Sequence, residues 1–343
     1  MADDSNHPCD SVADVLITSP VGIRVSAIEL SIIVPVMNEE ETVSTCVERV
    51  TAVLEGLDDP VAKSFEILFI DDGSTDRTLD VIRAASRANS RVRAISFSRN
   101  FGKEAALSAG LDYALGNAVV PMDADLQDPP EALSDMVAKW REGFEVVYGV
   151  RDNRESDSLP KRLTADLYYR AHNRLSNDKI PEHAGDYRLL DRRVVDVIRS
   201  MPERNRFMKG MFSWAGFKST AITYHRVERK AGTTKFKYWR LWTLAIDGIT
   251  SSSTVPLRVW SYLGGLVALT AMLYAAIIVL RTLVSGIDVP GYASMMVAIL
   301  FLGGLQLLSL GVLGEYVGRI LIETKRRPLY VVRERIGDDG IGE

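Results

Sequence analysis

Two long uncharged stretches in the C-terminal third limit most strongly how this chain can fold. No Asp, Glu, Lys or Arg occurs in residues 259–280 or in residues 289–314. Each stretch is longer than the ~20 apolar residues that a helix needs to cross a bilayer. The short loop 281–288 separates them, and Gly286 within the loop and Pro290 just after it are helix breakers. The sequence therefore predicts a hairpin of two transmembrane helices, and these lengths disfavour the alternative, a buried hairpin of a soluble core.

The charges beside the two predicted spans indicate their orientation. Arg258 precedes the first span, and a basic group follows the second: Arg319, Lys325, Arg326 and Arg327. Because positive residues are retained on the cytoplasmic side, both ends of the hairpin are expected there, with Arg281 in the loop as an exception. The N-terminal segment is acidic and has no apolar core, which is unlike a secretory signal. We expect an integral protein of the cell (inner) membrane with both termini in the cytoplasm.

Ahead of the hairpin, apolar strand patterns alternate with helical ones. The predicted strands are residues 31–37, 65–70, 92–97, 118–122 and 146–150. Such alternation indicates an α/β protein with a doubly wound, mostly parallel sheet. Neither G-x-G-x-x-G after the first strand nor G-x-x-x-x-G-K-[ST] occurs, which disfavours a Rossmann-type dinucleotide cofactor and a P-loop NTPase. Cys9 and Cys46 are too few for a disulfide framework or a cysteine metal site.

Polar side chains follow the predicted strands at the point where each strand ends. Ligands of doubly wound sheets bind beyond the carboxyl ends of the strands. We therefore expect one crevice to collect residues that are distant in sequence: Asp71, Asp72, Arg99, Lys103, Asp123 and Asp125.

Asp123 and Asp125 form a D-x-D triplet directly after the fourth strand. Residues two apart on an extended chain point the same way, so both carboxylates can face one ligand, with Gln127 just beyond. Oxygen ligands of this kind suit a hard divalent cation that also holds a diphosphate. Alone, the triplet is a weak signal, because solvated turn carboxylates commonly give the same pattern. Its neighbouring motifs strengthen the metal interpretation.

Four motifs, in this order, resemble those of one family. They are V-P-V-M-N-E-E at 34–40, I-D-D-G-S-T-D at 70–76, S-R-N-F-G-K-E at 98–104 and D-A-D-L-Q-D-P-P-E at 123–131. Together they resemble the family 2 glycosyltransferases with a GT-A fold, and most of all the polyprenyl-phosphate group, which includes bactoprenol glucosyltransferases and dolichol-phosphate mannose synthases. The resemblance spans roughly residues 31–327. It implies a nucleotide sugar donor, a polyprenyl phosphate acceptor in the membrane, and metal-dependent, inverting transfer.

The resemblance also implies roles for individual residues. Asp71 or Asp72 would contact the base or ribose, and the donor site as a whole would comprise Pro35, Glu39, Asp71, Asp72, Lys103 and Asp123. The expected ligands of Mg²⁺ or Mn²⁺ are Asp123, Asp125 and Gln127, which would hold the cation against the sugar diphosphate.

Residues 185–189, G-D-Y-R-L, resemble the family's G-D-F-R-L motif beside the reacting sugar. Asp186 is thus a catalytic candidate together with Asp125, either as a base or as a carboxylate that orients the acceptor. A phosphate monoester has a second pKa near ~6, so positioning matters more here than deprotonation. The alternative is a structural ion pair of Asp186 with Arg188 or Arg192.

Residues 204–240 are strongly basic and contain one acid, Glu228. Attraction to anionic lipid would contribute about 1 kcal/mol per basic residue. A more specific hypothesis rests on R-K-A-G-T-T-K at 229–235, which resembles the family's Arg…Gly-Ser-Lys loop, with Thr234 where Ser is usual. By that resemblance the acceptor or phosphate contacts are Arg151, Arg162, Arg229 and Lys235. Both interpretations can hold.

The predicted organisation has five parts. They are a flexible N-terminal tail at 1–28, a cytoplasmic GT-A domain at 29–235, an amphipathic juxtamembrane segment at 236–257, two transmembrane helices within 258–317 (about 259–283 and 290–315), and a cytoplasmic tail at 318–343. Paired glycines at 264–265 and 303–304 allow close helix contact, within the hairpin or between subunits, and we expect a homo-oligomer. No nucleic-acid partner is expected.

The sequence favours transfer of a sugar, best fitted by glucose from UDP-glucose, to undecaprenyl (polyprenyl) phosphate. GDP-mannose or a UDP-linked modified arabinose stays open as the donor. A non-catalytic membrane scaffold that binds nucleotide sugar or lipid is the alternative from another class. A processive synthase would carry Q-x-x-R-W, but neither Gln127 nor Gln306 begins that pattern. A nucleotidyltransferase would leave residues 185–189 and the spans unexplained.

Overall fold

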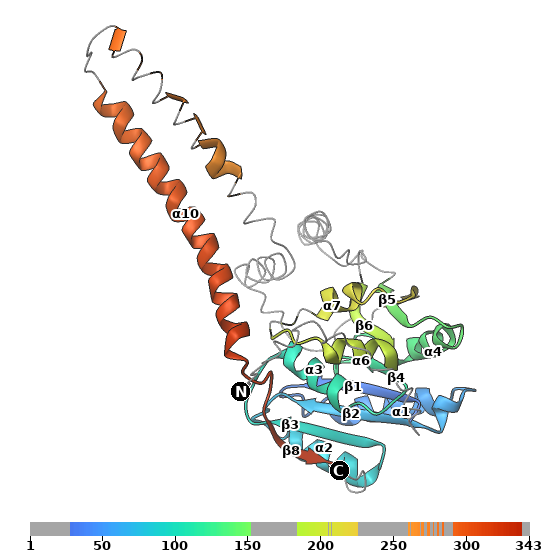
Figure 1. The fold of residues 1–343 in the computed structure, drawn as a ribbon. Coiled ribbons are helices and arrows are strands. Elements are labelled where there is room, and N and C mark those ends of the chain that lie inside the picture. The colour runs from blue at the N-terminus through green and yellow to red at the C-terminus, as the bar shows by residue number, and fades with distance from the viewer. Residues whose placement is uncertain are drawn as a thin grey trace, which may run out of the picture.

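The structure, a computed structural model, describes residues 28–151, 184–204, 206, 208–225, 291–337 and part of 260–284. One sheet runs through the body in the order β7-β5-β6-β4-β1-β2-β3-β8 (Figure 1). Its strands are β1 (Leu30–Val36), β2 (Phe65–Asp71), β3 (Val92–Phe97), β4 (Ala118–Pro121), β5 (Val146–Arg151), β6 (Ala184–Asp191), β7 (Ser219–Tyr224) and β8 (Val332–Ile336). The predicted strands are confirmed within a residue or two at each end.

The centre of the sheet is parallel, as the alternation of strands and helices predicts. β1 pairs with β2 on one side and β4 on the other, and β2 pairs with β3, all in parallel register. β6 lies antiparallel between β4 and β5, while β7 runs parallel to β5 at the edge. The carboxyl ends of β1, β2, β3 and β4 consequently meet at one edge of the sheet, which is where the polar motifs lie.

Helices cover both faces of the sheet. They are α1 (Val43–Glu55), α2 (Thr78–Ala88), α3 (Lys103–Tyr113), α4 (Leu133–Arg141), α6 (Arg192–Ser200) and α7 (Met208–Trp214), with short 3-10 turns η1 (Pro60–Ala62) and η2 (Pro130–Ala132). Helices α1 and α4 pack on one face, whereas α3 and α6 pack on the other.

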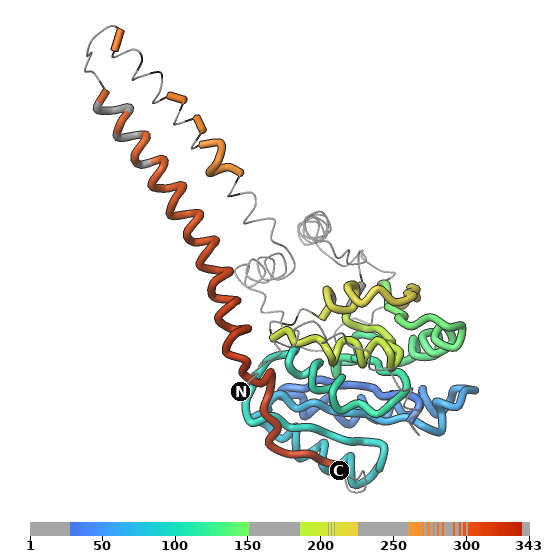
Figure 2. Tube along the Cα trace, viewed as in Figure 1, coloured from blue at the N-terminus to red at the C-terminus, as the bar shows by residue number. Residues whose placement is uncertain are grey.

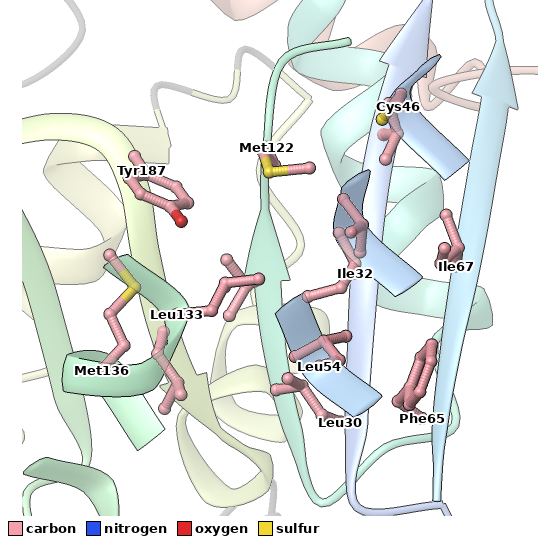
Figure 3. Close-up of a cluster of buried hydrophobic side chains, with 14 of the residues drawn as sticks. Leu30, Ile32, Cys46, Leu54, Phe65, Ile67, Met122, Leu133, Met136 and Tyr187 are labelled. Atoms are coloured by element: carbon pink, nitrogen blue, oxygen red, sulfur yellow. The ribbon is translucent and has the colours of Figure 1, made fainter. Parts of the chain in front are cut away.

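Successive side chains of the central strand β1 point to opposite faces of the sheet, so each joins the hydrophobic core on its own side. Ile32 and Val34 contribute to the core under α1 and α4, and Ile33 contributes to the core under α3. Figure 3 shows Ile32 of β1 among side chains of α1 and β2. A Cβ on Gly110 of α3 would lie 2.1 Å from Ile33 Cγ2, so this glycine lets the helix approach the sheet closely. Burial on both faces fixes the register of the parallel strands and hence the positions of their ends.

The longest helix, α10 (Tyr292–Lys325), projects away from the body (Figure 2). Among the described residues one helix is long and apolar enough to cross a membrane. Its residues Phe301–Lys325 have a mean hydropathy of 1.4 over the best window, and none of that window is buried. The described residues of the first predicted span, between 260 and 284, are helical as well. The fold class is confirmed: an α/β GT-A-like sheet followed by an apolar C-terminal helix consistent with a hairpin.

The chain returns to the body after α10, which the sequence analysis did not predict. Residues 318–343 were expected to be a tail, yet α10 continues to Lys325 and β8 pairs antiparallel with β3 at the edge of the sheet. Figure 1 shows β8 beside β3, with the C-terminus at that edge. The predicted N-terminal tail, apart from its last residue Ile28, and the amphipathic segment 236–257 lie outside the described residues.

Candidate active site

Asp71 ends β2 and Asp72 follows it, and internal hydrogen bonds hold both carboxylates. Asp71 accepts from Ser74 N (3.0 Å) and from Ser96 Oγ (2.7 Å), and it is 1% exposed. A buried carboxylate with several donors has a fixed orientation, because losing any one of them would leave an uncompensated charge. Asp71 therefore stabilises the turn after β2 and links it to β3.

Asp72 connects the end of β2 to the loop after β3. Its carboxylate accepts from Phe101 N (2.6 Å) and from Gly102 N (2.9 Å). Burial raises the pKa of Asp72, and these two N–H donors act against that shift. Gly73 has a φ of +72°, and a Cβ there would lie 2.5 Å from the carbonyl carbon of Arg99. The two motifs 70–76 and 98–104 thus pack backbone against backbone.

Lys103, the first residue of α3, brings together carboxylates from two other elements. Its Nζ lies 2.7 Å from Asp123 Oδ1, just beyond β4, and 3.5 Å from Asp186 Oδ2 on β6. Burial disfavours the charged ammonium, but the two carboxylates outweigh it and raise the pKa of Lys103 above its ordinary value of 10.5. The Lys103 and Asp123 side chains are 45% and 44% exposed, so an incoming ligand can reach this cluster.

The D-x-D loop turns sharply after Asp123. Leu126 adopts a left-handed conformation with a φ of 51°, and Asp125 Oδ1 accepts from Gln127 N (3.2 Å). Within the described part of the chain, no group of three or more His, Cys, Asp or Glu side chains is arranged to hold a metal ion. A site of one or two carboxylates completed by substrate phosphates remains compatible with this loop, and Mg²⁺ is commonly bound in that way.

Two tyrosines that the sequence analysis missed hold the far end of the same loop. The hydroxyl of Tyr224, the last residue of β7, donates to Asp128 Oδ1 (2.6 Å), and the hydroxyl of Tyr187 donates to Pro129 O (3.0 Å). The two rings meet edge to face at 5.6 Å. Figure 3 shows Tyr187 close to the helix that carries Leu133. Nothing in the sequence near Tyr224 marks it, because its partner is 96 residues away.

Pro35 and Glu39, the other predicted donor residues, lie at the end of β1 and in the turn after it. Glu39 N donates to Thr78 Oγ1 (2.8 Å), and the Glu39 carboxylate accepts from Thr42 Oγ1 (2.9 Å). Asn38, a residue the analysis did not single out, has a φ of 56° and accepts from Thr75 N (2.8 Å). An asparagine before two acids is a sequence signal for this turn, since Asn tolerates the left-handed region.

The predicted acceptor residues are described only in part. Arg151 ends β5, where its Cα pairs with that of Tyr224, while Arg162, Arg229 and Lys235 lie outside the described residues. Asp186 forms an ion pair with Lys103. The sequence analysis considered an ion pair of Asp186 with Arg188 or Arg192, but not with Lys103. Arg192 donates to the carbonyl oxygens of Ala114 and Gly116.

Comparison with known proteins identifies the class. A family model described as glycosyl transferase family 2 matches residues 31–199, and a second, described as the GtrB C-terminal hairpin, matches residues 255–320. The chain belongs to glycosyl transferase family 2 and is an enzyme of that class. The hairpin match and the apolar helix α10 together indicate association with a membrane.

Relatives with a narrower description extend over nearly the whole chain. A prophage bactoprenol glucosyl transferase homolog of Escherichia coli is 49% identical over 307 residues, which cover 89% of this chain and 98% of that protein. A bactoprenol glucosyl transferase of Shigella phage SfX is 48% identical over 307 residues, covering 90% and 99%. An uncharacterized glycosyltransferase of Synechocystis, sll0501, is 49% identical over 310 residues, covering 90% and 96%. The resemblance inferred from the four motifs is therefore confirmed.

Proposed function

We propose that this enzyme transfers glucose from UDP-glucose to undecaprenyl phosphate, a polyprenyl phosphate, at the cytoplasmic face of the cell (inner) membrane. The observation that carries the proposal is the cluster of Lys103, Asp123 and Asp186 at the carboxyl edge of the sheet. It occurs in a chain 49% identical to a bactoprenol glucosyl transferase homolog. The basic residues on both sides of the apolar hairpin support a cytoplasmic location for the body and both termini.

The donor is proposed to lie across the ends of β1, β2 and β4. The nucleoside would lie beside Pro35 and Glu39, next to the turn that Asp71 and Asp72 stabilise. Each carboxylate oxygen has two lone pairs, so an oxygen of Asp72 that already accepts one N–H can accept a further bond from a base or ribose. The pyrophosphate would lie between this turn and the D-x-D loop, within reach of the Lys103 ammonium.

A divalent cation, Mg²⁺ or Mn²⁺, is proposed to bind through Asp123 and Asp125, with Gln127 beside them. When bound, it would offset the negative charge that develops on the departing diphosphate. The residues fit such an ion because their oxygens are hard ligands and because the half-exposed Asp123 leaves room for substrate phosphate.

The acceptor phosphate is proposed to attack the anomeric carbon from the face opposite the diphosphate. A new C–O bond forms to the lipid phosphate while the C–O bond to the diphosphate breaks, which inverts the configuration. The acceptor monoester is largely dianionic at neutral pH, so this step requires no base. Asp186, paired with Lys103, would orient the acceptor, and the proposed phosphate contacts are Arg151, Arg162, Arg229 and Lys235.

The proposed function can be tested with the full chain in lipid nanodiscs that contain undecaprenyl phosphate. Radiolabelled UDP-glucose, GDP-mannose and dTDP-glucose are supplied separately with Mn²⁺, and the lipid phase is extracted. We expect label in the lipid from UDP-glucose, and its loss in Asp125→Asn and after addition of EDTA. Asp135→Asn is the matched control, because Asp135 is an exposed carboxylate on α4 outside the site.

Three results would contradict the proposal. Label from another donor alone would replace glucose with that sugar. Binding of nucleotide sugar without transfer from any donor would instead favour a membrane scaffold, and transfer that Asp125→Asn does not reduce would remove the D-x-D loop from the chemistry.

We also propose that the enzyme is a homo-oligomer. Gly303 and Gly304 lie on α10, where none of the residues that the structure describes comes within 4 Å of a Cβ placed on either glycine, so another helix could approach the backbone closely. Light scattering of the detergent-solubilised chain, corrected for bound detergent, would give its mass. A mass equal to that of one chain would contradict the proposal.

A further inference from the structure

The segment that follows α10 lies directly on the catalytic body. We call residues 326–337 the C-terminal segment. α10 ends at Lys325, and Arg326 caps its C-terminus with a left-handed φ of 47°. Within a few residues the Tyr330 ring stacks on Phe97 at 5.0 Å between centroids and 12° between planes. The Tyr330 hydroxyl also donates to Asp112 Oδ2 of α3 (2.7 Å).

Phe97, the partner of Tyr330, is the last residue of β3, and the loop that follows leads into the active site. The loop comprises residues 98–102. Ser98 N donates to Val331 O (2.9 Å), so the C-terminal segment contacts the first residue of the loop. Phe97 also meets the Phe101 ring edge to face at 5.7 Å. One aromatic cluster therefore joins the C-terminal segment to the loop.

The other side of the loop is fixed by Asp72. Phe101 N and Gly102 N both donate to its carboxylate, and Lys103 follows immediately as the first residue of α3. Gly102 has a φ of +98°, and the loop residues lie outside regular helix and strand. Its conformation therefore depends on contacts made from outside. They include those from Asp72 and Val331, the close packing of Gly73 on Arg99 and, through Phe97, the contact with Tyr330.

We propose that Tyr330 is a positioning residue for transfer: it holds the loop 98–102 so that Lys103 meets Asp123 and Asp186. The proposal rests on the proposed function of that cluster. Its physical basis is that misplacing a catalytic group by about 1 Å can reduce the rate roughly 10²-fold. It also gives the second apolar helix a direct connection to the active site, because only residues 326–329 separate α10 from Tyr330.

The distal half of the C-terminal segment, strand β8 (residues 332–336), supplies a matched control. Glu334 accepts from Arg83 Nε (3.2 Å) and Nη2 (2.7 Å), and Arg335 Nη2 donates to Tyr113 Oη (3.1 Å). These contacts hold β8 on the body at α2 and α3. Their partners, Arg83 and Tyr113, lie outside the loop 98–102. Weakening the distal half should therefore loosen the strand without displacing Lys103.

The experiment compares Tyr330→Ala, Tyr330→Phe and Glu334→Gln in the full chain in nanodiscs. Hydrogen exchange of a peptide covering residues 98–104 measures whether the amides of Phe101 and Gly102 stay bonded to Asp72. We expect exchange about tenfold faster in Tyr330→Ala, with kcat reduced roughly tenfold. Tyr330→Phe keeps the stacked ring and should restore both values nearly to wild type. Glu334→Gln should lower the unfolding temperature while leaving exchange at 98–104 and kcat unchanged.

Two outcomes would overturn the inference. The first is exchange at 98–104 in Tyr330→Ala equal to wild type. The second is a loss of kcat in both Tyr330→Ala and Glu334→Gln in proportion to their loss of stability, which would leave Tyr330 a purely structural role. Exchange is measured without substrate. A wild-type enzyme inactive with every donor would therefore contradict the proposed function, while the exchange data would still decide whether Tyr330 fixes the loop.

Discussion

The carboxylates that follow β2 and those that follow β4 lie at the same edge of the sheet but in opposite environments. Asp71 and Asp72 are 1% and 5% exposed, and backbone N–H and hydroxyl groups of the protein bind them. The Asp123 side chain is 44% exposed, and its partner is the ammonium group of Lys103, at the end of a flexible side chain. The first pair is a fixed frame, to which the nucleoside would add a bond at Asp72, whereas Asp123 can exchange its partner for a ligand. Aspartates thus stabilise the fold at the end of β2, whereas after β4 they are available for ligand binding.

Neutralising the exposed carboxylates should give the largest effect on activity. In Asp123→Asn and Asp125→Asn we expect turnover to fall by about 10²–10³-fold, because the charge that balances a cation and diphosphate is lost. The unfolding temperature should stay close to that of wild type, since neither carboxylate is buried. Transfer assays and thermal unfolding on the same samples check both parts. A large loss of stability in these variants would show that Asp123 and Asp125 also stabilise the fold.

Replacing a frame carboxylate should mainly affect stability. Asp72→Asn presents an amide N–H₂ to a backbone N–H that needs an acceptor, and an unsatisfied buried donor costs about 1–3 kcal/mol. Denaturant unfolding measures that change, with Asp125→Asn as the comparison. Equal stability of the two variants would remove the distinction between frame and ligand carboxylates.

Lys103, which lies between Asp123 and Asp186, should separate metal binding from donor binding. Lys103→Met removes a competing cation from Asp123, so the apparent affinity for Mn²⁺ should increase. It also removes a charged donor to the diphosphate, so KM for the nucleotide sugar should rise roughly tenfold. Titrations of Mn²⁺ and donor measure the two constants, and Lys103→Arg is the control that keeps the charge. Parallel weakening of both constants would contradict this exchange of partners.

Asp59, a carboxylate outside the site, should give the smallest effect, and it provides a reference for the pH dependence of stability. The hydrogen bonds from Arg141 hold the pKa of Asp59 below its ordinary value of 3.8. The folded-state pKa is depressed, so the stabilisation is present above pH 3.8 and is lost as the pH falls through the folded value. Arg141→Met should cost about 0.5–1 kcal/mol at pH 7 and less near pH 3.

The control for this prediction is Lys139→Met, which removes an exposed contact with Glu142, the residue that follows α4. Unfolding free energies of both variants at pH 7 and pH 3 give the comparison. A cost for Arg141→Met that is independent of pH would show that the packing of its side chain, which lies 4.4 Å from the Trp140 ring centroid, outweighs its charge.

Much of the fold and part of the site could be predicted from local patterns. Alternating strands and helices gave the parallel sheet, and the rule that ligands bind beyond strand ends brought Lys103 and Asp123 together in advance. The roles of Asp71 and Asp72 were less accessible, because only their donors distinguish a buried frame from a ligand site. These donors are Ser74 N, Ser96 Oγ and two amides of the loop 98–102. Tyr224 could not be found, since a tyrosine at the end of a strand has no local signal for a partner in the D-x-D loop.

The sequence by itself determined the class of the protein, the sheet that carries its motifs and the apolar helices that follow. Short-range periodicity and strand-end chemistry are local properties, so they can be read without coordinates. The return of residues 332–336 to β3 was decided only by the tertiary structure. A five-residue strand with three charged side chains, V-R-E-R-I, carries little hydrophobic signal, and it is stabilised by an unpaired strand edge and by Arg83, which is 251 residues away from Glu334. Such a partner exists only once the sheet has formed.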